Sequence, residues 1–209
     1  MRLKEYSHRW ATEVLANPEY SNLEGEIFDV LQRLPLIACG EQPWSQLPPN
    51  PPREYPVDQA ALNRWLDHEF RLIGWQVHPR VTPDLPLKSD YKKGRIQVEV
   101  QFGNVARYAY DLLKFQLAYT TGDIALGILV APTREFGTYI DKSIASFEKA
   151  ERELPIFDPT ITLPILVIGP WAGVLADRID RRKIVIAAQV YLTVVAVLFA
   201  SLVASGAVD

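Results

Sequence analysis

Hydrophobic residues recur at helical spacing in three stretches near the start of the chain. The first set is Leu3, Tyr6, Trp10 and Val14, and the second, after Ser21 and Asn22, is Leu23, Ile27, Val30, Leu31 and Leu34. The third set, which ends at Gly74, is Leu62, Trp65, Leu66, Phe70 and Ile73. The spacing predicts helices over residues 3–14, 23–34 and 57–73. Six prolines between residues 43 and 56 predict an extended surface connection.

The pattern changes to strict alternation over residues 96–102. Apolar Ile96, Val98, Val100 and Phe102 alternate with polar Gln97, Glu99 and Gln101. Successive side chains of a strand point to opposite faces, so this segment predicts a strand with one apolar and one polar face. The residues just before it include Gly94 and predict a turn that pairs this strand with the segment carrying Asp90.

Helical and strand patterns continue to alternate after residue 102. Asn104 is predicted to cap a helix from Val105 to about Tyr119, whose inward residues would be Ala109, Leu112, Leu113 and Leu117. An apolar run over 124–130 predicts a buried strand, a helix is expected near 139–153, and a short apolar run follows over 163–168. Alternating helices and buried strands predict an α/β core.

Length and composition are those of an ordinary soluble enzyme. The chain has 209 residues, 48% of them hydrophobic and 22% charged, which is enough for one sizeable domain and an appendage. Its one cysteine, Cys39, cannot form an internal disulfide, and the N-terminus has no apolar stretch of signal-peptide length. These features predict a cytoplasmic location.

The net charge of −3 argues against a generally basic nucleic-acid-binding surface. The charges are unevenly placed, however, because one short segment holds Lys88, Lys92, Lys93 and Arg95 around a single acid, Asp90. This cluster predicts a local DNA-binding surface. The alternative is an ordinary solvated turn.

Asp90 and Glu99 are candidate metal ligands for phosphodiester hydrolysis. That reaction uses a divalent cation to polarise the phosphate, and hard cations bind carboxylate oxygens. Glu99 and Gln101 share a strand face, and the turn would bring Asp90 alongside. The alternative is a half-exposed strand with ordinary polar residues. Glu69 is either an outer ligand or a solvent-facing acid, and His68 and His78 lack metal-ligand spacing, so structural or surface roles are expected.

The string from Asp90 through Glu99, Val100 and Gln101, D-x8-E-V-Q followed by FGN, resembles the BglII-type branch of the PD-(D/E)XK restriction endonucleases. Most of that superfamily has lysine at the last position, whereas this branch has glutamine. The resemblance implies an α/β restriction-endonuclease-like fold, a mixed sheet flanked by helices, over residues 1–169. It implies that Asp90, Glu99 and the Val100 carbonyl hold Mg²⁺ and that Gln101 orients the attacking water.

The activity implied by this resemblance is that of a type II site-specific deoxyribonuclease in a restriction–modification system. The substrate would be double-stranded DNA, with magnesium and no small-molecule cofactor. We expect a homodimer, because two-fold palindromic DNA is matched by two-fold protein symmetry.

The end of the chain has a different character. Residues 173–183, GVLADRIDRRK, resemble a loop motif of major facilitator transporters, with Asp180 where that family usually has glycine, and the resemblance extends over 163–209. Residues 184–208 carry no charge and could cross a bilayer, and the basic residues before them would keep the nuclease on the cytoplasmic side. We therefore predict a transporter-like fragment over 170–209 with a hydrophobic, membrane-associated helix over 184–208.

Three alternatives remain open from the sequence. Residues 184–208 could form a buried C-terminal helix of the soluble domain. The whole chain could be an inactive, membrane-anchored DNA-binding fusion. It could also be a truncated transporter fragment with an unrelated N-terminal segment.

Overall fold

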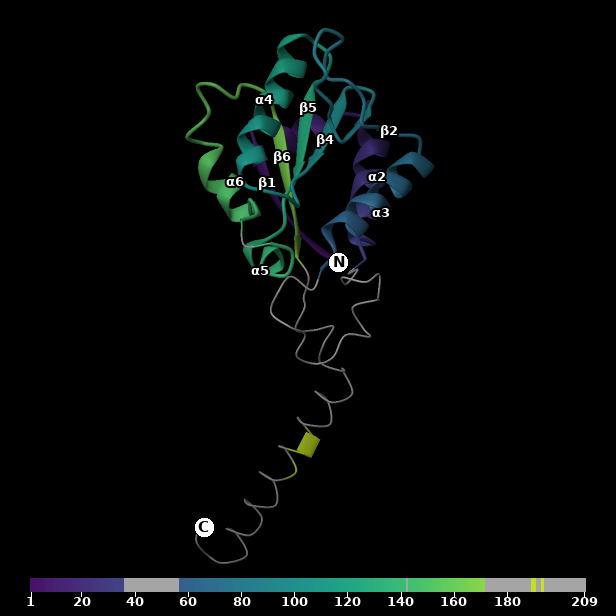
Figure 1. Cartoon of the computed structure of the whole chain (residues 1–209), viewed down its shortest axis with the longest axis vertical. Helices are drawn as coiled ribbons and strands as arrows, with labels where there is room; N and C mark the ends of the chain where they lie inside the picture. Colours follow the sequence, from purple (N-terminus) through teal and green to yellow (C-terminus); the bar gives the residue numbers. More distant parts are fainter. Residues whose placement is uncertain (36–56, 142, 172–188, 191–192, 194–209) are drawn as a thin grey trace, which may run out of the picture. The chain divides into compact units, whose positions relative to one another are not determined.

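The computed structural model describes residues 1–35, 57–141, 143–171, 189–190 and 193. Contacts divide the chain into a short unit, Gly173–Asp209, and one larger unit, Met1–Ala172. Its centre is a six-stranded mixed sheet in the order β1-β6-β5-β4-β3-β2 (Figure 1).

The middle of the sheet is parallel and its margins are antiparallel. Strands β4 (Ile96–Val100), β5 (Leu126–Val130) and β6 (Ile165–Trp171) run in the same direction. Strand β1 (Arg2–His8) pairs antiparallel with β6, and β2 (Gln76–Val77) and β3 (Tyr91–Lys93) pair antiparallel on the other side. The strand pattern predicted over 96–102, 124–130 and 163–168 is confirmed as β4, β5 and β6.

Helices cover both faces of this sheet. Helices α2 (Ser21–Gln32) and α3 (Gln59–Leu72) lie on one side, and α4 (Ala106–Thr120) and α6 (Phe147–Glu153) on the other (Figure 1). The short helices α1 (Ala11–Leu15) and α5 (Arg134–Gly137) complete the set.

Close packing under α4 depends on a glycine in β5. A Cβ atom on Gly127 would lie 2.9 Å from the ring of Phe115, so only glycine lets α4 approach the sheet this closely. Gly127 is paired with Gln97 of β4, so α4 covers the sheet face that also carries Glu99. Phe70 of α3 stacks on Tyr91, 4.2 Å between ring centroids, and therefore α3 covers the opposite face.

The helix predicted over 3–14 is wrong for residues 3–8, and only its last part is helical, as α1. Residues Arg2–His8 form β1, whose backbone pairs along the whole length of β6, from Arg2 opposite Trp171 to His8 opposite Ile165. The backbone then turns sharply, with positive φ at Arg9 and Trp10, and Trp10 is 72% exposed. Pairing with the edge of β6 therefore outweighs the local helical spacing.

Other boundaries follow the sequence pattern more closely. Helix α3 ends just before Gly74, which has φ +82°, and Gly94 has φ +56° in the turn between β3 and β4. The helix expected near 139–153 is shorter than predicted, because α6 begins at Phe147 with Ser146 accepting a hydrogen bond from the Lys149 amide. The proline-rich segment 43–56 lies outside the described residues.

The predicted hydrophobic helix over 184–208 also lies outside the described residues, except for residues 189, 190 and 193. Within the part of the chain that the structure describes, none of the helices combines the length and apolar character needed to span a bilayer.

Candidate active site

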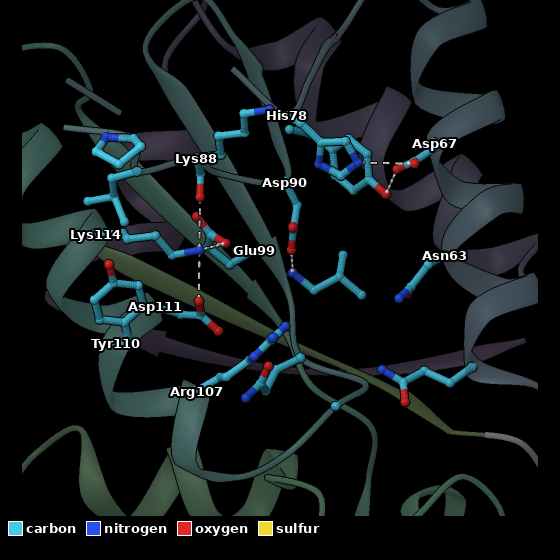
Figure 2. Close-up of a pocket in the computed structure, with 17 residues that line it drawn as sticks. Asn63, Asp67, His78, Lys88, Asp90, Glu99, Arg107, Tyr110, Asp111 and Lys114 are labelled. Atoms are coloured by element: carbon cyan, nitrogen blue, oxygen red, sulfur yellow. Dashed lines mark hydrogen bonds and ion pairs between the residues drawn. The ribbon is translucent and has the colours of Figure 1, made fainter. Parts of the chain in front are cut away.

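A cavity of about 500 Å³ opens between α3, α4 and the polar face of β4 (Figure 2). Helix α3 contributes Asn63 and Asp67, and the segment before β3 contributes His78, Lys88 and Asp90. Charged residues from β4 and α4 complete the lining: Glu99, Arg107, Asp111 and Lys114. The sequence-predicted residues Asp90, Glu99, Val100 and Gln101 all line this one cavity.

Alternation along β4 aims its polar side chains at the cavity side of the sheet. The Gln97 amide donates to Glu99 Oε1 at 2.8 Å, which fixes one oxygen of that carboxylate. The Gln101 amide donates to the Asn104 carbonyl at 3.0 Å, so its plane is also held. The polar face exists as predicted, but it is buried: Gln97 is 1%, Glu99 0% and Gln101 3% exposed.

Asp90 reaches β4 across the tight β3–β4 turn. The register pairs Tyr91 with Val98, which sets Asp90 beside the end of β4. Its Oδ2 accepts a hydrogen bond from the Val100 backbone N–H at 2.7 Å. The backbone turn at Gly94 therefore brings the two acids onto one cavity, as the sequence geometry indicates.

Helix α4 contributes an acid and a lysine that sequence reasoning missed. Lys114 Nζ forms ion pairs with Glu99 and with Asp111, the latter at 2.8 Å, and donates to the Lys88 carbonyl at 3.3 Å (Figure 2). The predicted inward face of this helix is partly wrong, because Ala109 and Leu113 are exposed.

The buried face of α4 mixes charged and apolar residues. Its members recur at i, i+3, i+4 and i+7, namely Asp111, Lys114, Phe115 and Ala118. A prediction from hydrophobicity alone ignores the two charged residues, so it assigns the wrong residues to the buried face of the helix. The opposite charges of Asp111 and Lys114, one helical turn apart, are the signal that could have found it.

Three acids of the cavity have raised pKa values, because the one nearby lysine does not offset the effect of burial. Burial, together with the nearby Asp90, raises the pKa of Glu99 to about 8, and Lys114 opposes this rise. Burial also raises the pKa of Asp90 and of Asp111. Burial alone would lower the pKa of Lys114, but Glu99 and Asp111 outweigh this and keep its pKa above the usual value. Lys114 is therefore positively charged among three acids.

A second polar group lies at the α3 side of the cavity. Asp67 accepts a hydrogen bond from the Tyr91 hydroxyl at 2.8 Å, and its other oxygen lies 3.1 Å from His78 Nε2. His78 is about half exposed and lines the cavity. Glu69, considered from the sequence as an outer ligand, instead pairs with Arg33 at 2.7 Å and does not line the cavity.

The basic cluster predicted from the sequence is divided between two environments. Lys92 pairs with Asp123, and Lys93 pairs with Glu26 at 2.8 Å, so both are partly neutralised away from the cavity. Lys88 is exposed and lines the cavity, where it is joined by Arg107 of α4. The cavity therefore has two cations at its exposed margin.

The donor set fits a hard divalent cation. Among the described residues, no three acidic, histidine or cysteine side chains form a complete metal cage. Magnesium does not require one, because it commonly takes one or two carboxylates and completes its shell with water and substrate phosphate oxygens. Asp90 and Glu99 supply carboxylates, Val100 offers a carbonyl, and a bound cation would favour the ionised forms of the two acids, whose pKa values are raised by burial.

Known proteins resemble this chain both in sequence and in fold. The model of the family described as restriction endonuclease BglII/BglIII matches residues 3–170. The chain belongs to this family. Its fold resembles that of restriction endonuclease BglII in complex with a DNA 16-mer, with a TM-score of 0.65 and 19% identity, covering 81% of this chain and 76% of the other. Free BglII gives a TM-score of 0.60 and 19% identity, covering 83% of this chain and 81% of the other. No curated protein matches the chain.

The end of the chain is similar to a second, unrelated family. A model described as a transmembrane secretion effector matches residues 140–209. This match overlaps the BglII-type match over residues 140–170, which include α6 and most of β6. Residues 140–170 therefore match both family models.

Proposed function

We propose that this restriction endonuclease-like protein is a magnesium-dependent, site-specific endonuclease that cleaves double-stranded DNA in a restriction–modification system. The observation that carries the proposal is the shared cavity, in which the partly buried Asp90 just before β3 and the buried Glu99 of β4 meet an amide, Gln101, in a chain of the BglII family. Binding of DNA by a BglII structure of the same fold supports the choice of substrate.

In this proposal Asp90, Glu99 and the carbonyl of Val100 hold the magnesium ion. The bound ion would polarise the scissile phosphate and make a water molecule more acidic. Gln101, whose amide is held by Asn104, orients the attacking water. Lys88 and Arg107 lie at the cavity margin, where they can contact the phosphates that flank the cleaved bond.

We also infer that the active form is a homodimer. A two-fold palindromic site is matched by a two-fold symmetric protein. Helix α4 leaves two large side chains, Tyr110 and Leu113, each 55% exposed, one turn apart beside the cavity. A helix face of this kind suits contact with a second copy. The mass of the full chain in solution, measured by light scattering, tests the dimer separately from the chemistry.

Incubation of the full chain with plasmid DNA tests the activity. We expect discrete fragments with Mg²⁺, and none after the metal is chelated. The matched variants are Glu99→Ala, in the cavity, and Glu153→Ala on α6, whose acid pairs with Lys149 outside it. Folded wild-type protein that leaves plasmid intact over a range of Mg²⁺ and Mn²⁺ concentrations contradicts the proposal.

The segment over 173–209 is proposed to associate with membranes. The supporting observations are the uncharged sequence over 184–208 and the match to a transmembrane family. Flotation of the full chain with lipid vesicles tests this, with Leu198→Arg as the variant expected to stay at the bottom of the gradient. Equal flotation of both proteins, or of neither, contradicts the proposal.

A further inference from the structure

We propose that Lys114 is a catalytic residue of this nuclease, supplied by helix α4 to stabilise negative charge on the phosphate during hydrolysis. The inference rests on the proposed function, since it assigns a further group to the same site. Neither the position of Lys114 in the sequence nor its helical pattern indicates such a role.

The geometry fixes the Lys114 ammonium within the cavity. Its side chain is 8% exposed, and its three N–H donors have three acceptors, which are Glu99 Oε2, Asp111 Oδ1 and the Lys88 carbonyl (Figure 2). The ammonium is thus bound directly to a carboxylate that we propose as a metal ligand. If Glu99 binds a metal ion in place of Lys114, the ammonium keeps its other two acceptors. Its third N–H is then able to donate to a phosphate oxygen.

A purely structural role does not account for this arrangement. A buried ion pair costs desolvation energy, and apolar side chains of similar size often stabilise a protein at least as well. On the same face of the sheet the positions beside Glu99 are apolar, with Leu129 paired to Glu99 and Val167 paired to Leu129. Apolar residues therefore fit on this face of the sheet, yet the protein buries Lys114 beside Glu99 and Asp111.

The charge that develops during the reaction favours a cation beside the phosphate. Attack of water on phosphorus forms a new P–O bond while the bond to the leaving oxygen breaks. The water proton passes to solvent and the leaving oxygen takes a proton from solvent, so Lys114 keeps its proton throughout. Negative charge grows on the phosphate oxygens in between, and an ammonium already held in place by protein acceptors stabilises that charge without having to reorganise.

The decisive comparison uses charge-balanced variants of the full chain. Lys114→Met alone leaves two buried acids without a counter-ion and can unfold the protein. The double variant Lys114→Met with Asp111→Asn removes one charge of each sign, and Asp111→Asn alone is its matched background. We expect the double variant to cleave DNA at least about 100-fold more slowly than Asp111→Asn in single-turnover conditions, with unchanged DNA affinity in Ca²⁺.

Two further measurements separate catalysis from structure. Added methylammonium should partly restore cleavage by a double variant with the shortened side chain, Lys114→Ala with Asp111→Asn, in a saturable way, because the truncation leaves room for the missing cation. Calorimetric Ca²⁺ binding without DNA should not be weaker in the double variant than in Asp111→Asn, since no proposed ligand is lost. Lys149→Met on α6, which breaks a partly exposed ion pair with Glu153 outside the cavity, should cleave normally.

The inference is overturned when the folded double variant cleaves within about threefold of Asp111→Asn, or when its loss is accounted for by weaker Ca²⁺ or DNA binding. These outcomes differ from failure of the proposed function. In that case wild-type protein would not cleave DNA, whatever the variants do.

Discussion

The two faces of strand β4 are equally buried and chemically opposite. Ile96 and Val98 on one face and Gln97 and Glu99 on the other are all 1% exposed or less. An inner strand of a parallel sheet ordinarily carries apolar residues on both faces, as β5 does with its fully buried LGILV segment. Burial of the apolar face of β4 therefore stabilises the fold, whereas burial of its polar face destabilises it. Polar residues at buried positions of this kind are expected at functional sites.

The contrast between the two faces of β4 indicates that the polar face carries the chemistry of the protein. On the apolar face, side chains are interchangeable by volume and affect mainly stability. On the polar face, each group is tied to a named partner: Gln97 to Glu99, Glu99 to Lys114 and Gln101 to Asn104. Substitutions on this face should change activity far more than stability.

The largest expected effect comes from removing the acid that faces β4 from the β3 side. Asp90→Ala removes a proposed metal ligand, so cleavage should fall by about 10³-fold or more. DNA binding in Ca²⁺ or metal-free buffer should survive, because no cation that contacts phosphate is lost. Single-turnover cleavage and fluorescence-anisotropy binding measure the two quantities. Cleavage within tenfold of wild type would remove Asp90 from the site.

A smaller loss is expected at the end of the polar face. Gln101→Ala keeps both acids and removes only the amide that we propose to orient the water, so cleavage should fall by about 10–100-fold. Calorimetric Ca²⁺ affinity should stay close to that of the wild type. A loss as large as that of Asp90→Ala, accompanied by lost Ca²⁺ binding, would instead make Gln101 part of the metal-holding structure.

The cost of the polar face should appear as a pH dependence of stability. The pKa of Glu99 is about 8 in the folded protein, above its ordinary value of 4.5, so its protonated form favours folding. Stability from this group is complete below pH 4.5 and is lost as the pH rises to about 8. Glu99→Gln removes this loss, so its Tm relative to wild type should rise by several degrees between pH 5 and pH 9. A constant Tm difference across that range contradicts the burial of an ionisable Glu99, and Glu153→Gln is the control.

The smallest effects concern the cations around the cavity. Arg107→Ala should lower the slope of log affinity against log salt by about 1, because one phosphate contact is lost. Lys88→Ala should act similarly. Lys92→Ala should change the slope less, since Lys92 pairs with Asp123. Equal slopes for all three variants and wild type would place the DNA surface elsewhere.

The alternating part of the site could be predicted from sequence, because strand geometry is local. The period of two in residues 96–102 and the glycine at 94 are enough to bring Asp90, Glu99 and Gln101 to one place. The β1 strand could not be predicted in the same way. Its partner β6 lies more than 150 residues later, so Arg2–His8 becomes a strand through a pairing that no local pattern encodes.

Lys114 and Asp67 show a different limit. Both lie on helices whose apolar residues are easily recognised, and both are directed into the cavity by tertiary packing against β4 and Tyr91. A helical pattern identifies apolar faces, so a charged residue on a buried face is assigned to solvent by default. The exposed Leu113 is the converse case, an apolar residue that the same pattern assigned to the core.

The most direct test of the account compares neighbouring residues on the two faces of β4. In one plasmid-cleavage experiment with Mg²⁺, rates per folded molecule are measured for wild type, Glu99→Ala and Val98→Ala. We expect Glu99→Ala to lose about 10³-fold or more in cleavage while retaining DNA binding. Val98→Ala should lose about 2 kcal/mol of stability but cleave at the wild-type rate. Wild-type cleavage by folded, DNA-bound Glu99→Ala would contradict the assignment of the chemistry to this face.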